Sequence, residues 1–325
     1  VRRIWQQGDA VEYRRGSGPA RDGGEGRFFR GNLHCHSNRS DGLLAPEDVV
    51  GAYREAGYDF VCLSDHFEAE YGWQVTDTRA LRDGGYTTIV GAELSSAPWE
   101  DRHAYWVTAA GLPVDFGAPP TDDHSEAIRR ARTLGAFVIM LHPGLNNLPL
   151  EAATYGLPAL EAVHAIEVYN HNGAMAAIPD GANGAYMLDG LLEGGRRVLV
   201  NAGDDAHFGH PQDRFGGWVE VHCETLDPEA LLGSLKAGRY YSTQGPSFRE
   251  LLAEGEQLWV QASDVYAITL TGSGDRWQSG QTRTSEGGGP IREAEFDLSP
   301  FRGSYCRVTV VDPAGRRAWS SPICP

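Results

Sequence analysis

The chain has 325 residues, 41% of them hydrophobic, and a formal net charge of −16 at pH 7. This length allows one large domain, or a large domain with a small one. No run of about twenty apolar residues is present that could span a membrane. Because the negative charge repels a nucleic-acid backbone, we expect no binding to duplex nucleic acid and favour a small diffusible substrate.

The start of the chain and its cysteines bear on the compartment. No signal peptide is visible, so a cytoplasmic location is expected. The sequence begins with Val1 rather than Met, and a leader cleaved before this residue stays an open alternative. Five cysteines without a CxxC spacing argue against a disulfide scaffold and against a cysteine-ligated zinc. A disulfide between Cys306 and Cys324 is the one pairing left open.

Residues 1–27 are polar and rich in Arg and Gly, and we interpret them as an N-terminal arm with one strand at Ala10–Tyr13. The next predicted strand, Phe28–Leu33, leads into the most informative stretch of the chain.

That stretch reads Asn-Leu-His-Cys-His-Ser-Asn-Arg-Ser-Asp-Gly at 32–42. His34 and His36 are two apart, so an extended strand directs both imidazoles to one face. Asp41 follows in a polar loop that can return toward the rings. Two imidazoles and a carboxylate on so short a tether suit a divalent transition metal, although a His-x-His pair alone also occurs at strand ends and surfaces.

A helix is predicted at Pro46–Ala56, since proline favours the first helical position and Gly57 ends the helix. Beyond it, apolar runs end repeatedly in polar residues that can bind metals. The runs are Phe60–Leu63, Thr87–Val90, Ala136–Leu141, Ala165–Val168 and Val198–Val200. The segments that follow them are Ser64-Asp65-His66, Gly91-Ala92-Glu93, His142-Pro143-Gly144, Tyr169-Asn170-His171 and Asn201-Ala202-Gly203-Asp204-Asp205-Ala206-His207.

Continuous apolar runs are typical of strands covered on both faces, and helices between several of them, such as Ser125–Leu134, indicate parallel connections. With Phe28–Leu33 there are six such runs, and His103–Ala109 is a seventh candidate. Polar residues at the strand ends favour an α/β fold with a distorted seven-stranded TIM-like barrel, whose chemistry gathers at one rim. An open doubly wound sheet is the alternative, but no Gly-rich phosphate loop supports it.

The sequence pattern changes after about residue 245. Short strands separated by Gly, Ser and Pro turns predict a small C-terminal all-β module at 246–325, after a barrel at 28–245. The predicted strands are Leu258–Gln261, Ala267–Thr271, Ala294–Leu298 and Cys306–Val311. A helix at Pro228–Ala237 and the segment Tyr240–Phe248 are expected to connect the two parts. The last histidine of the chain is His222, so the module contains none, and we expect a structural role for it.

Five histidines and three carboxylates are expected to converge on the barrel rim, with His103 as a possible ninth ligand. Such a number of buried polar groups needs charge compensation, which metal ions supply. The count exceeds the three or four ligands of one catalytic zinc, so we expect two or three divalent ions. The candidates are His34, His36, Asp41, His66, Glu93, His142, Asp205 and His207.

Five of these motifs, in this order, resemble the polymerase-and-histidinol-phosphatase (PHP) superfamily of metal-dependent hydrolases. They are His-x-His with Ser-Asp-Gly at 34–42, Ser-Asp-His at 64–66, Gly-x-Glu at 91–93, His-Pro at 142–143 and Asp-x-His at 205–207. The resemblance implies a distorted seven-stranded β/α barrel and two or three ions of manganese, iron or zinc. It also implies that the eight residues above are ligands and that Glu93 bridges two ions.

The family often supplies a further histidine between the Glu and the His-Pro motifs. His103 is the candidate, but it begins its apolar run, which on a parallel strand places it at the wrong end. His171, at a strand end, is the competing ninth ligand or a substrate contact. Tyr-Tyr-Ser-Thr-Gln-Gly-Pro at 240–246 and Gly-Arg-Arg-Ala-Trp-Ser-Ser-Pro-Ile at 315–323 resemble the C-terminal part of the carbaryl-hydrolase-like branch.

The expected chemistry is hydrolysis by a hydroxide held between two ions, because metal binding lowers the pKa of water toward about 7. We assign catalysis to Glu93, Asp205 and His207. Asp65 and Asp204 flank ligands and are expected to orient them. Arg214 is a candidate phosphate contact, with a structural salt bridge as the alternative.

The first hypothesis is a phosphoesterase that acts on a small phosphate ester or nucleotide. The alternatives are a carboxyl-ester, amide or carbamate hydrolase with the same site, and a non-catalytic metal- or ligand-binding module. No membrane partner is expected, and the sequence does not determine the oligomeric state.

Overall fold

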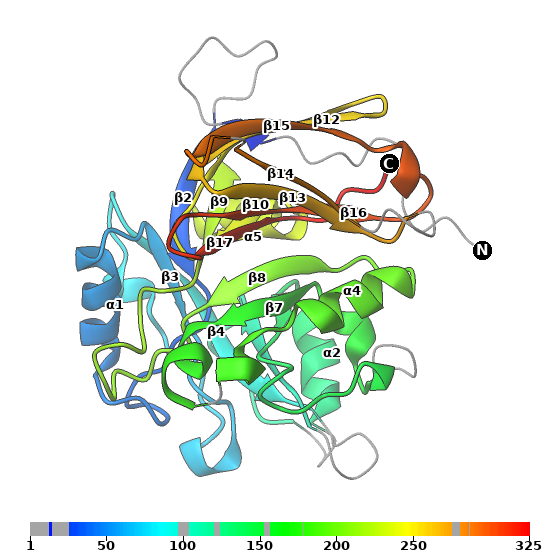
Figure 1. Ribbon diagram of the computed structural model, residues 1–325. Coiled ribbons are helices and arrows are strands. Elements are labelled where there is room, and N and C mark those ends of the chain that lie inside the picture. The colour runs from blue at the N-terminus through cyan, green and yellow to red at the C-terminus, as the bar shows by residue number, and fades with distance from the viewer. Residues whose placement is uncertain are drawn as a thin grey trace.

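The computed structural model describes residues 13–14, 26–96, 104–119, 124–152, 157–177, 179–274, 280–285 and 287–325. Figure 1 shows a lower lobe of strands and helices, coloured from blue to green, beneath an upper lobe of strands, coloured mainly from yellow to red. The predicted metal ligands belong to the lower lobe.

Seven buried strands form the wall of the lower lobe. They are β2 (Arg27–Asn32), β3 (Phe60–Leu63), β4 (Thr87–Ser95), β5 (Trp106–Ala110), β6 (Phe137–Met140), β7 (Ala165–Asn170) and β8 (Leu199–Gly203). Most of their side chains are covered on both faces of the sheet, which explains the continuous apolar runs in the sequence. β2, β3 and β4 are parallel, as are β6, β7 and β8.

Helices pack around this wall (Figure 1). They are α1 (Pro46–Glu55), α2 (Ser125–Thr133), α4 (Ala185–Glu193) and α5 (Pro228–Lys236). The predicted helices after Pro46, Ser125 and Pro228 are confirmed to within one residue, whereas α4 was not predicted. At α5 the Asp227 carboxylate accepts hydrogen bonds from two first-turn amides, which explains where this helix begins. In the part of the chain that the structure describes, no helix is long and apolar enough to cross a membrane.

β5 runs antiparallel to both of its neighbours, β4 and β6. The chain passes from β4 to β5 without a described helix, and the Ser96 amide donates to the Tyr105 carbonyl between them at 2.8 Å. A direct return of this kind makes an antiparallel pair. The N-terminal end of β5 therefore lies at the edge where the other strands end, which removes the objection to His103. His103 itself lies outside the described residues.

The expected closed seven-stranded barrel is not confirmed. Two antiparallel strands, β9 (Trp218–Cys223) and β10 (Tyr240–Thr243), follow β2 in the sheet, and β8 is its last strand at the other side. β8 still contacts β10, since the Ser242 hydroxyl of β10 donates to the Val200 carbonyl of β8 at 3.1 Å. Beyond the strands, Cys35 and Ala206 form a parallel bridge.

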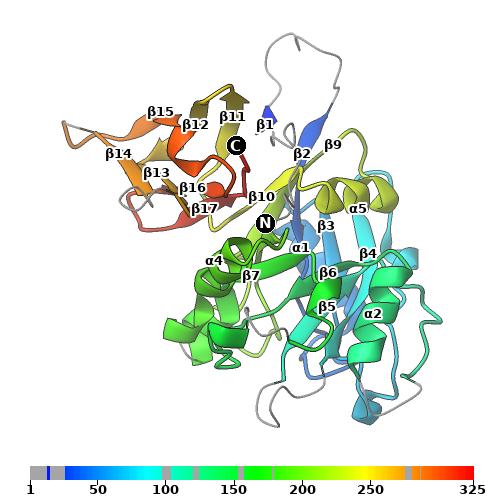
Figure 2. The same ribbon diagram turned by 90° about the vertical axis from the view of Figure 1, so that its right-hand side faces the viewer.

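The upper lobe has seven strands, where the sequence predicted four. They are β11 (Phe248–Glu254), β12 (Gln257–Val265), β13 (Ala267–Gly272), β14 (Gly280–Thr284), β15 (Ile291–Asp297), β16 (Cys306–Val311) and β17 (Arg317–Ser320). β11, β12 and β15 form one sheet with the short β1 (Tyr13–Arg14), and Figure 2 shows it as a layer over β13, β16 and β17.

The second sheet of the upper lobe continues into the lower lobe. β17 pairs with β10, so that Ser242 lies opposite Trp319, and one 13-stranded sheet runs through both lobes. Hydrophobic contacts cross the junction as well, since the lower-lobe core includes Tyr305 and Trp319 and the upper-lobe core includes Tyr241. The domain boundary near residue 245 stays a prediction. A bidentate ion pair reinforces the junction, since Arg307 donates to Asp189 on α4 at 2.9 and 2.7 Å.

The open possibility of a Cys306–Cys324 disulfide is wrong, since both residues keep their thiols. Cys306 lies opposite Ile323, and each amide donates to the other's carbonyl. Because adjacent residues of an extended chain point to opposite faces, Cys324 is directed away from Cys306.

Candidate metal centre

Residues 34–36 continue beyond β2 between two neighbouring strand ends. The His36 amide donates to the Ala206 carbonyl at 2.8 Å, and the Ser64 amide donates to the Cys35 carbonyl at 2.9 Å. These bonds hold the segment extended and turn the imidazoles of His34 and His36 into the lobe, where both are fully buried. The two rings lie 5.4 Å apart between centroids. The spacing noted in the sequence thus produces a pair of neighbouring rings.

A first group of four potential ligands lies at the bottom of the site. It joins His34 and His36 to Glu93, from β4, and Asp205, which follows β8. His34 Nε2 lies 3.1 Å from Glu93 Oε2 and 3.2 Å from Asp205 Oδ1, and His36 Nε2 lies 3.2 Å from the same two oxygens. All four residues are buried. His142 adjoins this group, with Nε2 at 3.7 Å from Glu93 Oε1.

A second group shares His36 and opens toward solvent. It adds Asp41, His66 and His207. Asp41 Oδ2 lies 3.1 Å from His207 Nε2 and 3.4 Å from His66 Nε2, while Asp41 Oδ1 lies 3.5 Å from His36 Nδ1. The Asp41 side chain is 39% exposed, so this group forms the entrance to the site.

Two glycines permit this close arrangement. A Cβ atom on Gly42 would lie 2.6 Å from the carbonyl oxygen of His36, so only glycine allows the loop to return Asp41 to the rings. A Cβ atom on Gly203 would lie 2.5 Å from a carboxylate oxygen of Glu167 and 3.0 Å from Cβ of His34. Side chains at either position would displace groups of the site.

Two of the predicted ligands have strained backbones. His142 has φ 28° and Asp205 has φ 58°, both in the left-handed region that residues other than glycine rarely adopt. Each such conformation costs on the order of 1–3 kcal/mol and persists where the surrounding structure enforces it. Around Asp205 the enforcing contact is the hydrogen bond from its amide to the His34 carbonyl, at 2.9 Å. Five other described residues also have positive φ, so this strain is not confined to the predicted ligands: Trp73, Asn147, Ala159, Phe208 and Phe215.

The donor set fits divalent metal ions. Several buried ring nitrogens form no hydrogen bond of good geometry: both nitrogens of His36, Nδ1 of His66 and Nδ1 of His142. Leaving such atoms unpaired costs about 1–3 kcal/mol each, whereas a cation between the rings and the carboxylates accepts the lone pairs that face it. Among the described residues, no arginine or lysine lies within ion-pair distance of Asp41, Glu93 or Asp205. Nitrogen and carboxylate oxygen together suit manganese, iron or zinc.

The electrostatic field of the site favours cations. Burial opposes ionisation of Glu93 and Asp205, but the charge of His34 and hydrogen bonds from histidines hold the pKa of both carboxyl groups well below the usual value. Burial also opposes protonation of His36, yet Asp205 and Glu93 raise its pKa to about 10. Clustered carboxylates thus attract positive charge strongly, and bound metal ions would replace the protons on the rings.

Glu167 is a site residue that the sequence interpretation missed. It is fully buried on β7, its Oε1 accepts from His34 Nδ1 at 2.9 Å, and its Oε2 accepts from the His142 amide at 2.9 Å and from Asn170 Nδ2 at 3.0 Å. Because Glu167 accepts a hydrogen bond from Nδ1–H of His34, the proton of the neutral ring stays on Nδ1. Nε2 is then left as an acceptor that faces the first group. A carboxylate inside the apolar run Ala-Ile-Glu-Val at 165–168 was the available sequence signal.

We expect Glu167→Gln to weaken metal binding by about 10- to 100-fold while the protein stays folded, because the amide matches the shape of the carboxylate but lacks its charge. Competition with a fluorescent chelator measures this affinity. Glu161→Gln is the matched control, since Glu161 lies outside the site and pairs with Arg129 at 2.8 Å. Equal metal affinity in the two variants would contradict the orienting role of Glu167.

Asp65 and Asp204 hold backbone segments and not imidazole rings. Asp65 accepts from the Ser37 amide at 2.6 Å and from the hydroxyls of Ser37, Ser40 and Thr76, so it holds the loop between His36 and Asp41. Asp204 accepts from the Tyr53 hydroxyl at 2.8 Å and from three consecutive backbone amides, those of residues 215–217. Their expected action on the ligands is therefore indirect.

His171 and Arg214 lie outside the two ligand groups. Nδ1 of His171 lies 2.9 Å from the Tyr169 hydroxyl, and its ring packs against Gly216. Arg214 pairs with buried Asp213 at 3.1 Å and donates to the His210 carbonyl at 2.8 Å. These contacts match the structural alternative for Arg214, and substrate binding by either residue stays a prediction.

No protein-family model matches the chain, and no curated protein matches it. Solved structures do resemble it. A two-domain protein from Bacteroides vulgatus ATCC 8482, described as containing a predicted PHP-like metal-dependent phosphoesterase, aligns with a TM-score of 0.50 and 16% identity over 95% of this chain and 99% of its own. The chain shares the overall fold of this protein. At this identity the resemblance establishes the fold alone.

Two weaker resemblances involve shorter alignments. A putative metal-dependent phosphoesterase from Bifidobacterium adolescentis has a TM-score of 0.39 and 14% identity, over 56% of this chain and 89% of its own. The lesion-specific endonuclease PfuEndoQ from Pyrococcus furiosus has a TM-score of 0.42 and 13% identity, over 64% of this chain and 56% of its own. The expected exclusion of duplex nucleic acid gains no support from these proteins and stays a prediction.

Proposed function

We propose that the protein is a multinuclear metal-dependent hydrolase of small phosphate esters. The observation that carries this proposal is the pair of four-ligand groups that share His36. One ion needs three or four such ligands, so two groups accommodate at least two ions. The PHP-like fold adds support, because a protein of the same fold is described as containing a metal-dependent phosphoesterase. Divalent ions in such a site lower the pKa of bound water toward about 7 and act as Lewis acids.

The residues of the site have different roles, which depend on where they lie. Glu93 faces His34, His36 and His142, so its charge is suited to bridge neighbouring ions. Asp41 stands at the entrance, where a carboxylate can take part in binding an ion that also meets substrate. Glu167 fixes the tautomer of His34 from below. The buried first group excludes bulk water, and the half-exposed second group leaves an approach for a small substrate.

Phosphate esters are the favoured substrate class because several phosphoryl oxygens can gain from a multinuclear cationic site. The alternative, a carboxyl-ester, amide or carbamate hydrolase, has one observation in its favour. Among the described residues no arginine or lysine touches the ligand groups, so no fixed protein cation selects for an anionic substrate. The resemblance of segments 240–246 and 315–323 to the carbaryl-hydrolase-like branch belongs to this alternative. A non-catalytic module is disfavoured because the eight residues predicted as ligands lie close enough together to hold metal ions.

The test is turnover of a substrate panel by manganese-, iron- and zinc-loaded protein. Small phosphomonoesters or phosphodiesters, including mononucleotides, are expected to exceed aryl esters and carbamates in kcat/KM by at least ~10-fold. Duplex DNA is expected to be a poorer substrate than mononucleotides, because the net charge of −16 repels a polyanion. If an ester or carbamate instead leads every phosphate by ~10-fold, the alternative hydrolase replaces this proposal.

A further inference from the structure

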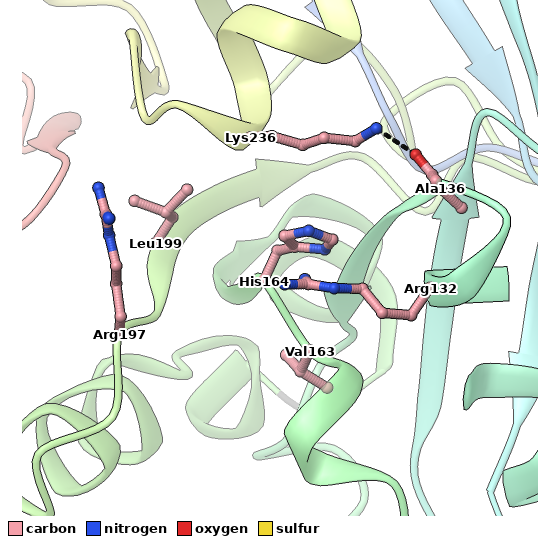
Figure 3. Close-up of a pocket in the computed structure, with 8 residues that line it drawn as sticks. Arg132, Ala136, Val163, His164, Arg197, Leu199 and Lys236 are labelled. Carbon is pink, nitrogen blue, oxygen red and sulfur yellow. Dashed lines mark hydrogen bonds between the residues drawn. The ribbon is translucent and has the colours of Figure 1, made fainter. Parts of the chain in front are cut away.

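A cavity of about 440 Å³ lies at the end of the lower lobe opposite to the metal centre (Figure 3). Its lining includes residues just before β6 and β7, the start of β8, and the last turns of α2 and α5. β6, β7 and β8 are parallel and carry site residues toward their C-terminal ends, so the cavity is at their N-terminal ends. None of its lining residues belongs to the metal centre.

The cavity is surrounded by positive charge. Arg132, Arg197 and Lys236 line it, their side chains are exposed at its mouth, and no carboxylate is among its lining residues. The chain as a whole has 44 acidic and 28 basic residues. A lining with three cations and no carboxylate is therefore opposite in charge to the protein as a whole. Lys236 is, moreover, the single lysine of the sequence.

Arg132 and Lys236 are close enough in this space for the charge of one to affect the other. Burial lowers the pKa of Arg132, and burial together with the charge of Arg132 lowers the pKa of Lys236. Figure 3 shows the Arg132 guanidinium extending toward the His164 ring, with Lys236 reaching across from α5. Like charges that line one cavity are relieved by a bound anion.

His164, at the floor, adds a neutral donor. The Val138 amide donates to its Nδ1 at 2.9 Å, which leaves the ring proton on Nε2. Burial, followed by the charges of Arg132 and Lys236, lowers the pKa of His164 to about 3, so the ring is uncharged at pH 7. The floor also includes Val163 and Leu199, which offer an apolar surface beside these donors.

Capping of helix ends accounts for only part of this arrangement. Lys236 donates to the Gly135 carbonyl just beyond α2, and Arg132 Nη1 donates to the Ala162 carbonyl at 3.4 Å. Cations at the ends of helices are stabilised by the helix dipole. These contacts, however, use one of three ammonium protons of Lys236 and one of five guanidinium protons of Arg132.

We propose that this cavity binds the phosphate group of a small phosphorylated molecule, with Arg132 and Lys236 beside the phosphate. Arginine forks and an ammonium are the groups that recognise phosphate through charge-assisted hydrogen bonds. Val163 and Leu199 contact the carbon skeleton of the ligand, and the volume lies in the range of small-molecule sites. The site is separate from the metal centre and does not depend on the proposed hydrolysis.

The single lysine makes a direct test possible. Protein labelled with [¹³C]lysine gives one Cε–Hε signal, that of Lys236, and zinc-loaded protein avoids paramagnetic broadening. Inorganic phosphate is expected to shift this signal saturably, whereas sodium chloride at equal ionic strength is not. A hexose phosphate and a nucleoside monophosphate are titrated in parallel. If the hexose phosphate or the nucleoside monophosphate binds more tightly than inorganic phosphate, the ligand is an organic phosphate. If inorganic phosphate binds more tightly, the ligand is the free anion. Both outcomes support a phosphate site.

Variants tie the shift to the cavity. Arg132→Gln is expected to raise the dissociation constant for phosphate at least ~10-fold, because it removes a charge-assisted contact. Arg129→Gln, on the same helix as Arg132 but paired with Glu161, is expected to leave it within ~2-fold. No saturable shift at ~20 mM phosphate would overturn the proposal, since that affinity is weaker than one such site provides. An equal dissociation constant in the Arg132 variant and the Arg129 control would overturn it as well.

Discussion

Glu93→Gln is expected to remove at least one metal equivalent per chain and to lower turnover by at least ~100-fold, because a direct ligand matters at least as much as the groups that orient it. The variant keeps the shape of the side chain but loses the charge that faces His34, His36 and His142 at 3.1–3.7 Å. An uncharged amide cannot bridge two cations as a carboxylate does. Elemental analysis of the purified variant and its kcat on the best substrate of the panel measure the two effects.

Asp65→Asn is the matched control for this prediction. It also converts a buried carboxylate to an amide, but its partners are the backbone and hydroxyl groups of the loop at residues 37–40 and Thr76. The asparagine side chain can keep part of these hydrogen bonds, so metal content is expected to stay near that of the unmodified protein. If both variants lost metal equally, the distinction between a ligand and a loop anchor would be wrong.

Removal of the metals by chelation is expected to lower the stability of the protein markedly. Without ions, the buried carboxylates of Glu93 and Asp205 are balanced only by protonated histidines. Each site that is filled at 100 times its dissociation constant adds about 2.7 kcal/mol, so two sites add about 5 kcal/mol. For a chain of 325 residues this corresponds to a fall in Tm of about 7 °C. Differential scanning calorimetry before and after dialysis against chelator measures the change.

Re-addition of manganese, iron or zinc is expected to restore Tm in proportion to the metal bound, with at least two equivalents per chain at saturation. The Glu93→Gln variant should recover less than the unmodified protein, which connects the thermal effect to the ligand groups. A saturating content of one equivalent or less would contradict the multinuclear site. An unchanged Tm after complete metal removal would show that the charge balance of the site does not depend on ions.

A large part of the ligand set was accessible from the sequence. Apolar runs that end in His66, Glu93, His142 or Asp205 are recognisable because a strand buried on both faces excludes polar residues until it reaches the rim. The eight residues predicted as ligands from these patterns do lie together. Helix starts at Pro46 and Pro228 were equally readable, since proline at the first helical position is a local signal.

Other features depend on contacts between distant segments. Glu167 lies inside an apolar run, and only its distance of 2.9 Å to His34, 133 positions away, shows what it does. The antiparallel direction of β5 and the pairing of β17 with β10 follow from chain connections that carry no periodic pattern.

The anion cavity is the clearest case. Residues 132, 164, 197 and 236 share no motif, and each alone is an ordinary surface cation or a strand-end histidine. Sequence patterns report whether a residue is buried or exposed and how each element begins. Which distant side chains share one space is decided by the packing of whole elements. The clustering of the residues predicted as ligands could therefore be expected from the sequence, and the cavity could not.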